Sequence, residues 1–417
     1  MNDLLSTVSV IGLGYIGLPT ASLLATKGFK VQGCDVSPHV VETINRGDIH
    51  IVEQDLDILV RSAVHSGQLR ASLTPEAADV FIIAVPTPFK ANHVPDLAYV
   101  ESATRAIAPQ LKPGNLVILE STSPVGTTEK IANWLGQLRP DLMMPGANVK
   151  QDQIFIAHCP ERVLPGQIIR ELVDNDRIIG GIDVASAEKA HDFYQTFVQG
   201  QILLTDARTA EMSKLTENAF RDVNIAFANE LSNICEKLDI NVWELIKLAN
   251  HHPRVNILQP GPGVGGHCIA VDPWFIVDSA PTEARLIKTA REVNDDKPKR
   301  VLAKIKQEAS RFKTPIIACL GLSFKADIDD LRESPAFEIV QHLAAEEIGE
   351  LLVVEPHIEV LPAKLASFQP RTQLVAMEEA INRADVVVLL VNHRLFSHLD
   401  KGSLLGKAVI DTRGFWQ

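Results

Sequence analysis

The chain alternates short apolar runs with stretches of helical periodicity over its first half and again near its end. The apolar runs of the first half are Val8–Ile11, Lys30–Cys34, Val80–Val85, Leu116–Leu119 and Ile154–Ala157. From about Thr314, similar runs lie within PIIACLGLSFK, LLVVEP, ADVVVLLVNH and AVIDTRG. This alternation predicts βαβ units whose parallel strands are covered by helices on both faces.

Between about Asp206 and Asn250 the pattern becomes helical and contains neither proline nor glycine. We predict one long helix followed by a second, in a region that joins the two sheet domains and is a candidate oligomer interface. The expected fold class is therefore α/β, with two parallel-sheet domains joined by a central helical domain. At 417 residues the chain is long enough for two or three domains.

Polar and turn residues follow several of the predicted strands. They are Asp35, Pro86-Thr87-Pro88, Ser121-Thr122-Ser123-Pro124 and Cys159-Pro160-Glu161. In open α/β sheets, ligands bind beyond the carboxyl ends of the strands. We therefore expect these loops to form a ligand site.

Composition excludes several classes of partner. Forty basic and 52 acidic residues leave a formal net charge of −12, and no basic run could follow a phosphate backbone, so we expect no nucleic-acid partner. No stretch approaches the roughly 20 apolar residues of a membrane helix, so we expect no membrane partner. The amino-terminal MNDLLSTVSVIGLGYIG lacks a basic region, which argues against a signal peptide.

The cysteines are odd in number, widely spaced and never in a CxxC pair: Cys34, Cys159, Cys235, Cys268 and Cys319. This argues against a disulfide framework and against a zinc site. We expect a reduced, cytoplasmic protein without a bound metal.

The motif GLGYIG at 12–17 follows a predicted strand and opens a helical stretch. In that context, a GxGxxG motif provides a tight turn, close approach of a pyrophosphate and close helix–sheet packing. Asp35 lies eighteen residues after Gly17, at the end of the second strand, where a carboxylate can accept hydrogen bonds from a ribose 2′-hydroxyl. No arginine follows to hold a 2′-phosphate, so we expect NAD rather than NADP.

Other polar and charged residues permit both a structural and a functional interpretation. Lys214, Asn218 and Arg221 share one helical face, which is either a solvated stripe or a site that stabilises an oxyanion. His252 and Arg254 precede a glycine-rich loop, either as surface residues or as a diphosphate clamp. In the last region, Lys325, Asp327, Arg332, Ser334 and Arg413 follow predicted strands, where ligand sites are common.

The stretch GPGVGGHCIAVDP at 261–273 places Cys268 directly after a group of glycines. Gly-Pro-Gly and Gly-Gly are turn formers, and a single cysteine usually packs as a small apolar residue. The alternative is that Cys268 is a nucleophile. The residues of this stretch alone leave both interpretations open.

Together with PTP at 86–88, STSPVGTT at 121–128, CPER at 159–162 and FKADIDDLRESP at 324–335, these motifs resemble the nucleotide-sugar 6-dehydrogenases, the family of UDP-glucose dehydrogenase. The resemblance covers essentially the whole chain. AVPTPF at 84–89, the stretch 250–275 and TAREVND at 289–295 are most similar to the bacterial branch that oxidises UDP-N-acetyl-D-mannosamine for enterobacterial common antigen and related polysaccharides. Glucose-specific relatives typically follow the cysteine with Pro-Lys-Asp, whereas Ile-Ala-Val-Asp follows it here.

The resemblance implies an NAD-binding Rossmann domain at 1–205, a central helical dimerisation domain with the cysteine loop at 206–300 and a Rossmann-like UDP-sugar-binding domain at 301–417. It implies a four-electron oxidation of the C6 alcohol by two NAD⁺, through a thiohemiacetal and a thioester on Cys268. It also implies a homodimer or higher homo-oligomer, in which Arg254 reaches the neighbouring subunit's site.

The resemblance also assigns the site residues. The catalytic residues are Cys268, Lys214, Asn218 and Asp272. The NAD-binding residues are Gly12, Gly14, Tyr15, Ile16, Gly17, Asp35, Thr87, Thr122 and Arg332. The substrate-binding residues are Glu161, Arg162, Lys214, Asn218, Arg221, His252, Arg254, Gly265, Phe324, Lys325 and Arg413.

Three alternatives remain open. The same chemistry could act on UDP-N-acetylglucosamine or UDP-glucose, because one sequence does not show the shape of a sugar pocket. A non-catalytic nucleotide-sugar-binding paralogue would have no use for the thiol. A 3-hydroxyacid dehydrogenase would share the GLGYIG motif, but its two-electron reaction would not need Cys268.

Overall fold

The computed structural model describes residues 6–146, 153–164, 166–266 and 268–416. The start of the stretch in which we expect no signal peptide, residues 1–5, lies outside these ranges. The chain divides into two compact units. The first comprises residues 1–217 and 278–280, and the second comprises 218–277 and 281–417.

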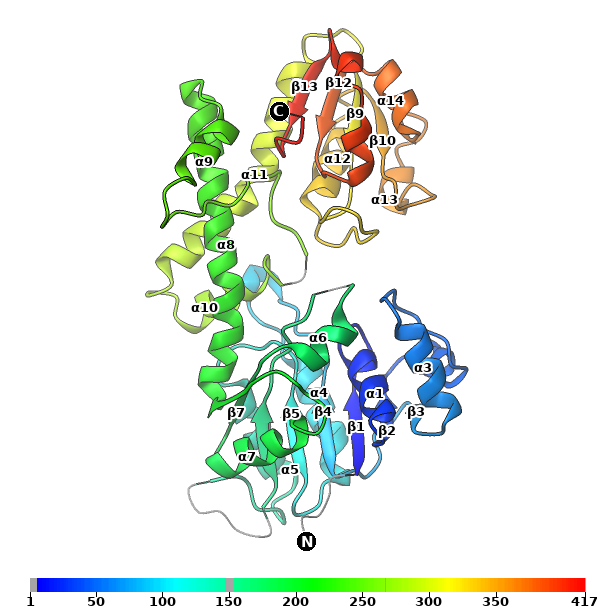
Figure 1. Cartoon of the computed structure of the whole chain (residues 1–417), viewed down its shortest axis with the longest axis vertical. Helices are drawn as coiled ribbons and strands as arrows, with labels where there is room; N and C mark the ends of the chain where they lie inside the picture. The colour runs from blue at the N-terminus through cyan, green and yellow to red at the C-terminus, as the bar shows by residue number, and fades with distance from the viewer. Residues whose placement is uncertain (1–5, 147–152, 165, 267, 417) are drawn as a thin grey trace. The chain divides into compact units, whose positions relative to one another are not determined.

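The first unit is built on an eight-stranded sheet with the strand order β3-β2-β1-β4-β5-β6-β7-β8. Its strands are β1 (Thr7–Ile11), β2 (Lys30–Cys34), β3 (Leu69–Ser72), β4 (Val80–Ile83), β5 (Leu116–Leu119), β6 (Phe155–His158), β7 (Arg177–Gly181) and β8 (Ile202–Asp206). Its helices are α1 (Gly17–Thr26), α2 (Pro38–Asn45), α3 (Leu56–His65), α4 (Ala98–Ile107), α5 (Thr127–Leu138), α6 (Ile168–Asp174) and α7 (Val184–Tyr194), with short 3₁₀ turns at Ala91–His93 and Ala108–Gln110. Figure 1 shows the helices packed around this sheet.

Alternate residues of the strands face two separate hydrophobic clusters. In β4, Val80 and Ile82 belong to one cluster, and Phe81 and Ile83 belong to the other. All four are fully buried, so the strand has no solvent-exposed face and contains no polar residue. The predicted parallel sheet with helices on both faces is confirmed for these strands.

One strand pairing departs from the parallel prediction, because β6 pairs with β7 in antiparallel fashion. β7 and β8 are parallel to each other. Antiparallel neighbours need no crossover connection, so the segment that joins β6 to β7 stays at the carboxyl end of β6. This arrangement keeps the CPER motif close to Arg177, the first residue of β7.

The second unit contains a five-stranded, all-parallel sheet with the order β11-β10-β9-β12-β13. Its strands are β9 (Ile316–Leu320), β10 (Glu350–Val354), β11 (Thr372–Leu374), β12 (Val386–Leu389) and β13 (Ala408–Asp411). Its helices are α12 (Pro335–Ala345), α13 (Ala363–Ala366) and α14 (Met377–Arg383), with 3₁₀ turns at Arg394–His398 and Lys401–Leu404. In β9, Ile317 and Cys319 face one cluster and Ala318 and Leu320 the other.

Four further helices form the central region: α8 (Ala207–Leu238), α9 (Val242–Ala249), α10 (Asp272–Ser279) and α11 (Arg285–Ala309). The predicted pair of helices between about 206 and 250 is confirmed by α8 and α9. The division between the two units falls inside α8, after Glu217. Among the helices of the described residues, none has the length and apolar character needed to cross a bilayer.

Candidate active site

The three glycines of the GLGYIG loop have different surroundings. Gly12 has φ +90°, and a Cβ there would lie 2.6 Å from the Ala84 carbonyl oxygen. A Cβ on Gly17 would lie 1.8 Å from the Gly12 carbonyl oxygen. A Cβ on Gly14 would meet no described atom within 4 Å. The fold itself therefore demands glycine at 12 and 17, whereas the open space at 14 fits close approach of a pyrophosphate to the loop.

The other predicted NAD residues of the first unit surround this loop. The Asp35 carboxylate accepts hydrogen bonds from the backbone N–H groups of Leu13 (3.0 Å) and Ser37 (2.9 Å). Thr87 donates its hydroxyl to the Thr122 carbonyl (2.5 Å), which ties the loop after β4 to the loop after β5. Tyr15 is exposed and Ile16 is half-buried. The loops that the sequence placed at one sheet edge thus meet there.

The CPER motif follows β6 and carries two paired charges. Glu161 is buried and forms an ion pair with the equally buried Arg177. Arg162 pairs with Glu217 of α8 at 2.8 Å. Lys214, half-buried on α8, favours the ionised form of Glu161, but burial is the larger effect and raises the pKa of that carboxyl. Of the predicted catalytic residues, Lys214 is therefore the one placed beside the CPER loop.

Two buried glutamates that the sequence analysis did not select also support these loops. Glu211 of α8 accepts hydrogen bonds from the backbone N–H groups of Gly126 (2.5 Å) and Thr128 (2.7 Å) at the start of α5. Glu120 follows β5 and accepts a hydrogen bond from the Tyr194 hydroxyl at 2.7 Å. The sequence indicated Glu120 only as a single carboxylate directly after the fully apolar run LVIL.

In the second unit, Cys268 lies one helical turn before Asp272, the first residue of α10. The Asp272 backbone N–H donates to the Cys268 carbonyl at 2.8 Å. The buried Asp272 carboxylate accepts a hydrogen bond from the Asn218 amide at 2.5 Å. Cys268 is exposed, whereas the other four cysteines are buried. The structure therefore brings three of the four predicted catalytic residues together.

The glycine loop before Cys268 packs against residues of the loops that follow β9 and β13. A Cβ on Gly265 would lie 2.3 Å from the Glu333 carbonyl oxygen and 3.0 Å from the Phe324 Cβ. A Cβ on Gly261 would lie 2.6 Å from Nη1 of Arg413. Side chains at these positions would separate the cysteine loop from Phe324 and Arg413, which is the physical reason for the glycines. Predicted substrate residues distant in sequence thus converge on this loop.

Other predicted substrate and NAD residues lie at the surface of the second unit. Lys325, Arg221, His252 and Arg254 are exposed. Arg332 is held by Asp330 through two hydrogen bonds of 2.8 and 2.6 Å. Nothing in these positions tests a role for Arg332 toward NAD, and that role stays a prediction.

Asp327, His357 and His393 offer ligand atoms within 4.8 Å of one another. Nδ1 of His393 accepts a hydrogen bond from the Asp327 backbone N–H at 2.9 Å, and its Nε2 lies 3.1 Å from Glu355. Both nitrogens of this buried ring are thus engaged by the protein, which does not suit a metal ligand. His393 and Glu355 instead hold the loop that carries Phe324 and Lys325. Glu355 accepts hydrogen bonds from the backbone N–H groups of Leu322 and Ser323 in that loop.

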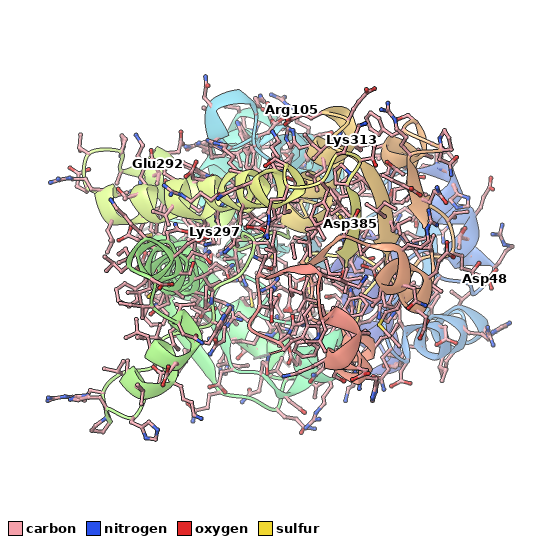
Figure 2. The ribbon with its side chains drawn as sticks, turned by 90° about the horizontal axis from the view of Figure 1, so that it is seen from above. Asp48, Arg105, Glu292, Lys297, Lys313 and Asp385 are labelled. Atoms are coloured by element: carbon pink, nitrogen blue, oxygen red, sulfur yellow. The ribbon has the colours of Figure 1, made fainter. Side chains whose placement is uncertain are left out.

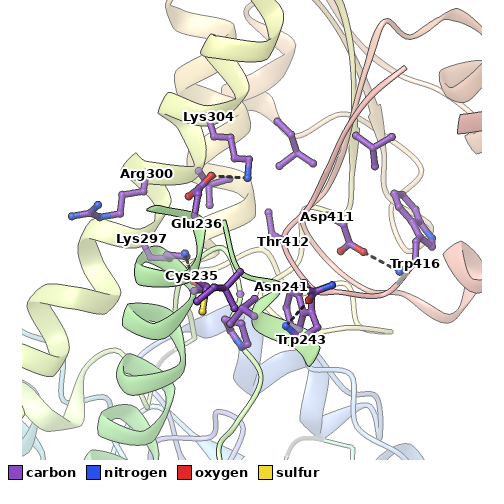
Figure 3. A pocket seen from close by; sticks show the side chains of 18 of the residues that line it. Cys235, Glu236, Asn241, Trp243, Lys297, Arg300, Lys304, Asp411, Thr412 and Trp416 are labelled. Carbon is purple, nitrogen blue, oxygen red and sulfur yellow. Dashed lines mark hydrogen bonds and ion pairs between the residues drawn. The ribbon is translucent and has the colours of Figure 1, made fainter. Parts of the chain in front are cut away.

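A cavity of about 680 Å³ lies among α8, α9, α11 and β13 (Figure 3), and its lining residues include none of the predicted catalytic residues. Lys304 and Glu236 form an ion pair of 2.6 Å at its wall. Lys297 points inward, whereas Glu292 and Lys313 lie at the surface (Figure 2). Lys297 donates to Ser232 Oγ at 2.6 Å, and burial lowers its pKa to about 8. The cations here are already engaged by the protein itself.

Comparison with known proteins agrees with this geometry. Residues 6–198 match the NAD binding domain of the UDP-glucose/GDP-mannose dehydrogenase family, residues 208–296 match its central domain and residues 318–417 match its UDP binding domain. The chain belongs to this family. The family shows that the protein is an NAD-dependent dehydrogenase with a domain for the UDP part of its substrate. The expected family, fold class and cofactor are therefore confirmed.

Members of the UDP-glucose/GDP-mannose dehydrogenase family from several bacteria are similar over nearly their whole length. An NDP-N-acetyl-D-galactosaminuronic acid dehydrogenase of Ralstonia nicotianae is 64% identical over 98% of this chain and 96% of its own. The UDP-N-acetyl-D-mannosamine dehydrogenase of Campylobacter jejuni is 63% identical over 93% of this chain and 96% of its own. The structure of the UDP-N-acetyl-mannosamine dehydrogenase Cap5O of Staphylococcus aureus has a TM-score of 0.87 and 43% identity over 98% of this chain and 95% of that one.

Proposed function

We propose that this dehydrogenase oxidises UDP-N-acetyl-D-mannosamine to UDP-N-acetyl-D-mannosaminuronate, with water and two NAD⁺ as co-substrates. The observation that carries this proposal is the exposed Cys268 thiol, one helical turn from a buried Asp272 that binds Asn218. Relatives named for UDP-N-acetyl-D-mannosamine support the substrate. The alternatives are an NDP-N-acetylgalactosamine sugar, which the Ralstonia relative's name suggests, UDP-N-acetylglucosamine and UDP-glucose.

The proposed reaction needs a covalent step because an aldehyde cannot readily give up a second hydride. The GLGYIG loop and Asp35 would hold NAD⁺, which would supply the hydride acceptor for C6 in each of the two oxidations. Between them, the Cys268 thiolate adds to the C6 aldehyde and forms a thiohemiacetal, which the second oxidation converts to a thioester. Water then cleaves the thioester, so that the acid leaves and the thiol is restored. The net reaction releases three protons when the product acid is ionised.

The other three predicted catalytic residues have proposed roles in this reaction. Lys214 takes a proton from the reacting hydroxyl or stabilises the oxyanion. The Asn218 amide orients an oxygen of the substrate, and its 2.5 Å hydrogen bond to Asp272 holds that amide in place. Asp272 in turn positions the amide or the attacking water.

Binding roles complete the proposal. Phe324, Arg413 and Gly265 would hold the nucleotide part, because they converge on the cysteine loop. The remaining predicted substrate and NAD contacts, and the three-part division at 1–205, 206–300 and 301–417, stay proposals.

The product would serve a cell-surface polysaccharide such as enterobacterial common antigen. Five free cysteines suit a reducing cytoplasm, the proposed location.

The stoichiometry of the reaction tests the proposal. Purified protein with excess NAD⁺ and a limiting amount of UDP-N-acetyl-D-mannosamine should form two NADH for each sugar consumed. UDP-N-acetylgalactosamine, UDP-N-acetylglucosamine and UDP-glucose, tested in parallel, should each give at least about tenfold lower kcat/KM. One NADH per sugar would overturn the thioester mechanism. A preference for another sugar would overturn only the substrate, and no NADH from any sugar would favour the non-catalytic paralogue.

We also propose that the protein forms a homodimer through α8. Phe220, Phe227 and Ile234 follow one another at intervals of two helical turns and share one face of this helix. Their side chains are 71%, 54% and 46% exposed, which is unusual for large apolar residues in a row. A second copy of the same helix would cover them. The exposed Arg254 would then be available to the neighbouring subunit's site.

Replacing Phe227 with aspartate should weaken the dimer at least about tenfold, because a charge would be buried in the apolar interface. Sedimentation at several protein concentrations measures the effect. The exposed Glu230→Ala variant on the same helix is the matched control and should remain dimeric. The proposal would be contradicted if light scattering during turnover showed a monomer while the wild-type protein was fully active.

A further inference from the structure

A buried cluster of ionisable groups lies behind the CPER loop of the first unit. It contains two carboxyl groups, Glu120 and Glu161, and a single guanidinium, Arg177, all less than 7% exposed. The cluster is contributed by separate parts of the fold: Glu120 follows β5, Glu161 follows β6 and Arg177 begins β7. The proposed function assigns no role to Glu120 or Arg177.

The partners of the two carboxyl groups differ. Arg177 pairs directly with Oε1 of Glu161, whereas Oε2 of Glu161 has no hydrogen-bond partner among the described residues. Glu120 accepts its 2.7 Å hydrogen bond from Tyr194 and lies 3.5 Å from the Thr20 hydroxyl. The guanidinium therefore neutralises Glu161 directly and Glu120 only from a distance.

The charge balance of this cluster favours one retained proton. With both carboxyl groups ionised, a net negative charge would be buried, which is costly in a site with little access to water. Burial and the neighbouring Glu161 raise the pKa of Glu120, while Arg177, Tyr194 and Thr20 oppose this shift. The charged or titratable groups that face the pair are Arg177, Tyr194, Cys159 and, on the Glu161 side, Lys214. The buried Cys159 thiol stays protonated, since burial raises its pKa to about 12.

We propose that the buried pair Glu120 and Glu161 retains one proton between its two carboxyl groups near neutral pH, without a direct hydrogen bond between them, so that the protonation of Glu120 sets the charge that Glu161 presents to Lys214. Glu120 is a positioning residue that acts through Glu161 and contacts no reactant itself. The retained proton is a property of the free protein and does not depend on the proposed function. Only its effect on proton transfer by Lys214 rests on that function. The proposed reaction releases protons. The cluster provides a buried proton acceptor beside Lys214, the proposed catalytic lysine.

Infrared difference spectra of the free protein, recorded between about pH 5 and pH 9, test the retained proton. Wild type should show a protonated carboxyl band that titrates near neutral pH, and Glu120→Gln should remove it. Asn115→Asp, which adds a carboxyl group elsewhere in the same unit, controls for effects of mutation on the baseline. Absence of a titrating buried carboxyl in wild type would overturn the inference, whatever the enzyme oxidises.

The pH dependence of kcat supplies a second test, with opposite signs for two variants. Glu120→Gln removes the like charge beside Glu161, so the acidic limb should move to lower pH by roughly one unit. Tyr194→Phe removes the hydrogen bond that favours ionised Glu120, so the limb should move to higher pH. Shifts in the same direction, or none, would contradict the inference. If wild type fails to form two NADH while the infrared result holds, the proposed mechanism fails and the retained proton stands.

Discussion

Replacing Cys268 with serine should lower kcat for uronate formation by about three orders of magnitude or more. A serine hydroxyl is a much weaker acid than a thiol, so it supplies little of the anionic nucleophile near neutral pH and adds poorly to the aldehyde. The second oxidation then lacks the covalent intermediate that donates its hydride. NADH production and acid formation, followed separately, measure the effect.

The other cysteines offer a matched control for this variant. Cys235 is 2% exposed on α8, and Cys235→Ala should retain most of the wild-type activity. In addition, a thiol reagent should modify Cys268 first in the native protein, because it is the exposed one of the five cysteines. NAD affinity should be unchanged in both variants. A Cys268→Ser enzyme that forms two NADH per sugar at an undiminished rate would exclude covalent catalysis through this residue.

Substitutions at Gly14 and Gly17 should separate NAD binding from folding. Gly14→Val should weaken NAD binding on the order of a hundredfold, because its side chain would occupy the space that the pyrophosphate needs. It should leave the free energy of unfolding almost unchanged, since a Cβ at Gly14 meets no described atom within 4 Å. Calorimetric titration and denaturant unfolding measure the two quantities.

Gly17→Ala is the counterpart and should act on stability. Its Cβ would lie 1.8 Å from the Gly12 carbonyl oxygen, so the loop or α1 must move. We expect a loss of about 3 kcal/mol or more in the free energy of unfolding. Normal NAD affinity in Gly14→Val, or normal stability in Gly17→Ala, would show that the loop does not work as its geometry indicates.

Several strands were missed in the sequence for identifiable reasons. β7 has the sequence RIIGG, in which an arginine and two glycines obscure the apolar run. Arg177 can be buried there because Glu161 neutralises it, a pairing that local sequence does not reveal. β3 and β11 are short, with the sequences LRAS and TQL, and contain too few apolar residues for a period to be recognised.

Only the local spacing within the candidate site could be predicted from the sequence, because the residues around Cys268 alone left a structural role for this cysteine open. Cys268 and Asp272 lie four residues apart, and the structure places them one helical turn apart at the start of α10. The hydrogen bond between Asn218 and Asp272 spans fifty-four positions, and the sequence suggested a shared site only through the family resemblance. Glu120 was not recognisable, because its partners Tyr194 and Thr20 approach it only after the sheet has formed.

The sequence by itself determined the α/β class, the nucleotide-binding loop and the long helix α8, because these depend on periodicity and turn chemistry among neighbouring residues. The tertiary structure alone decided the antiparallel direction of β7, the packing of Gly265 against Phe324 and the pairing of Glu161 with Arg177. These features join residues that are distant along the chain. Their energies come from burial and charge neutralisation, which exist only once the two partners have been brought together in the folded protein.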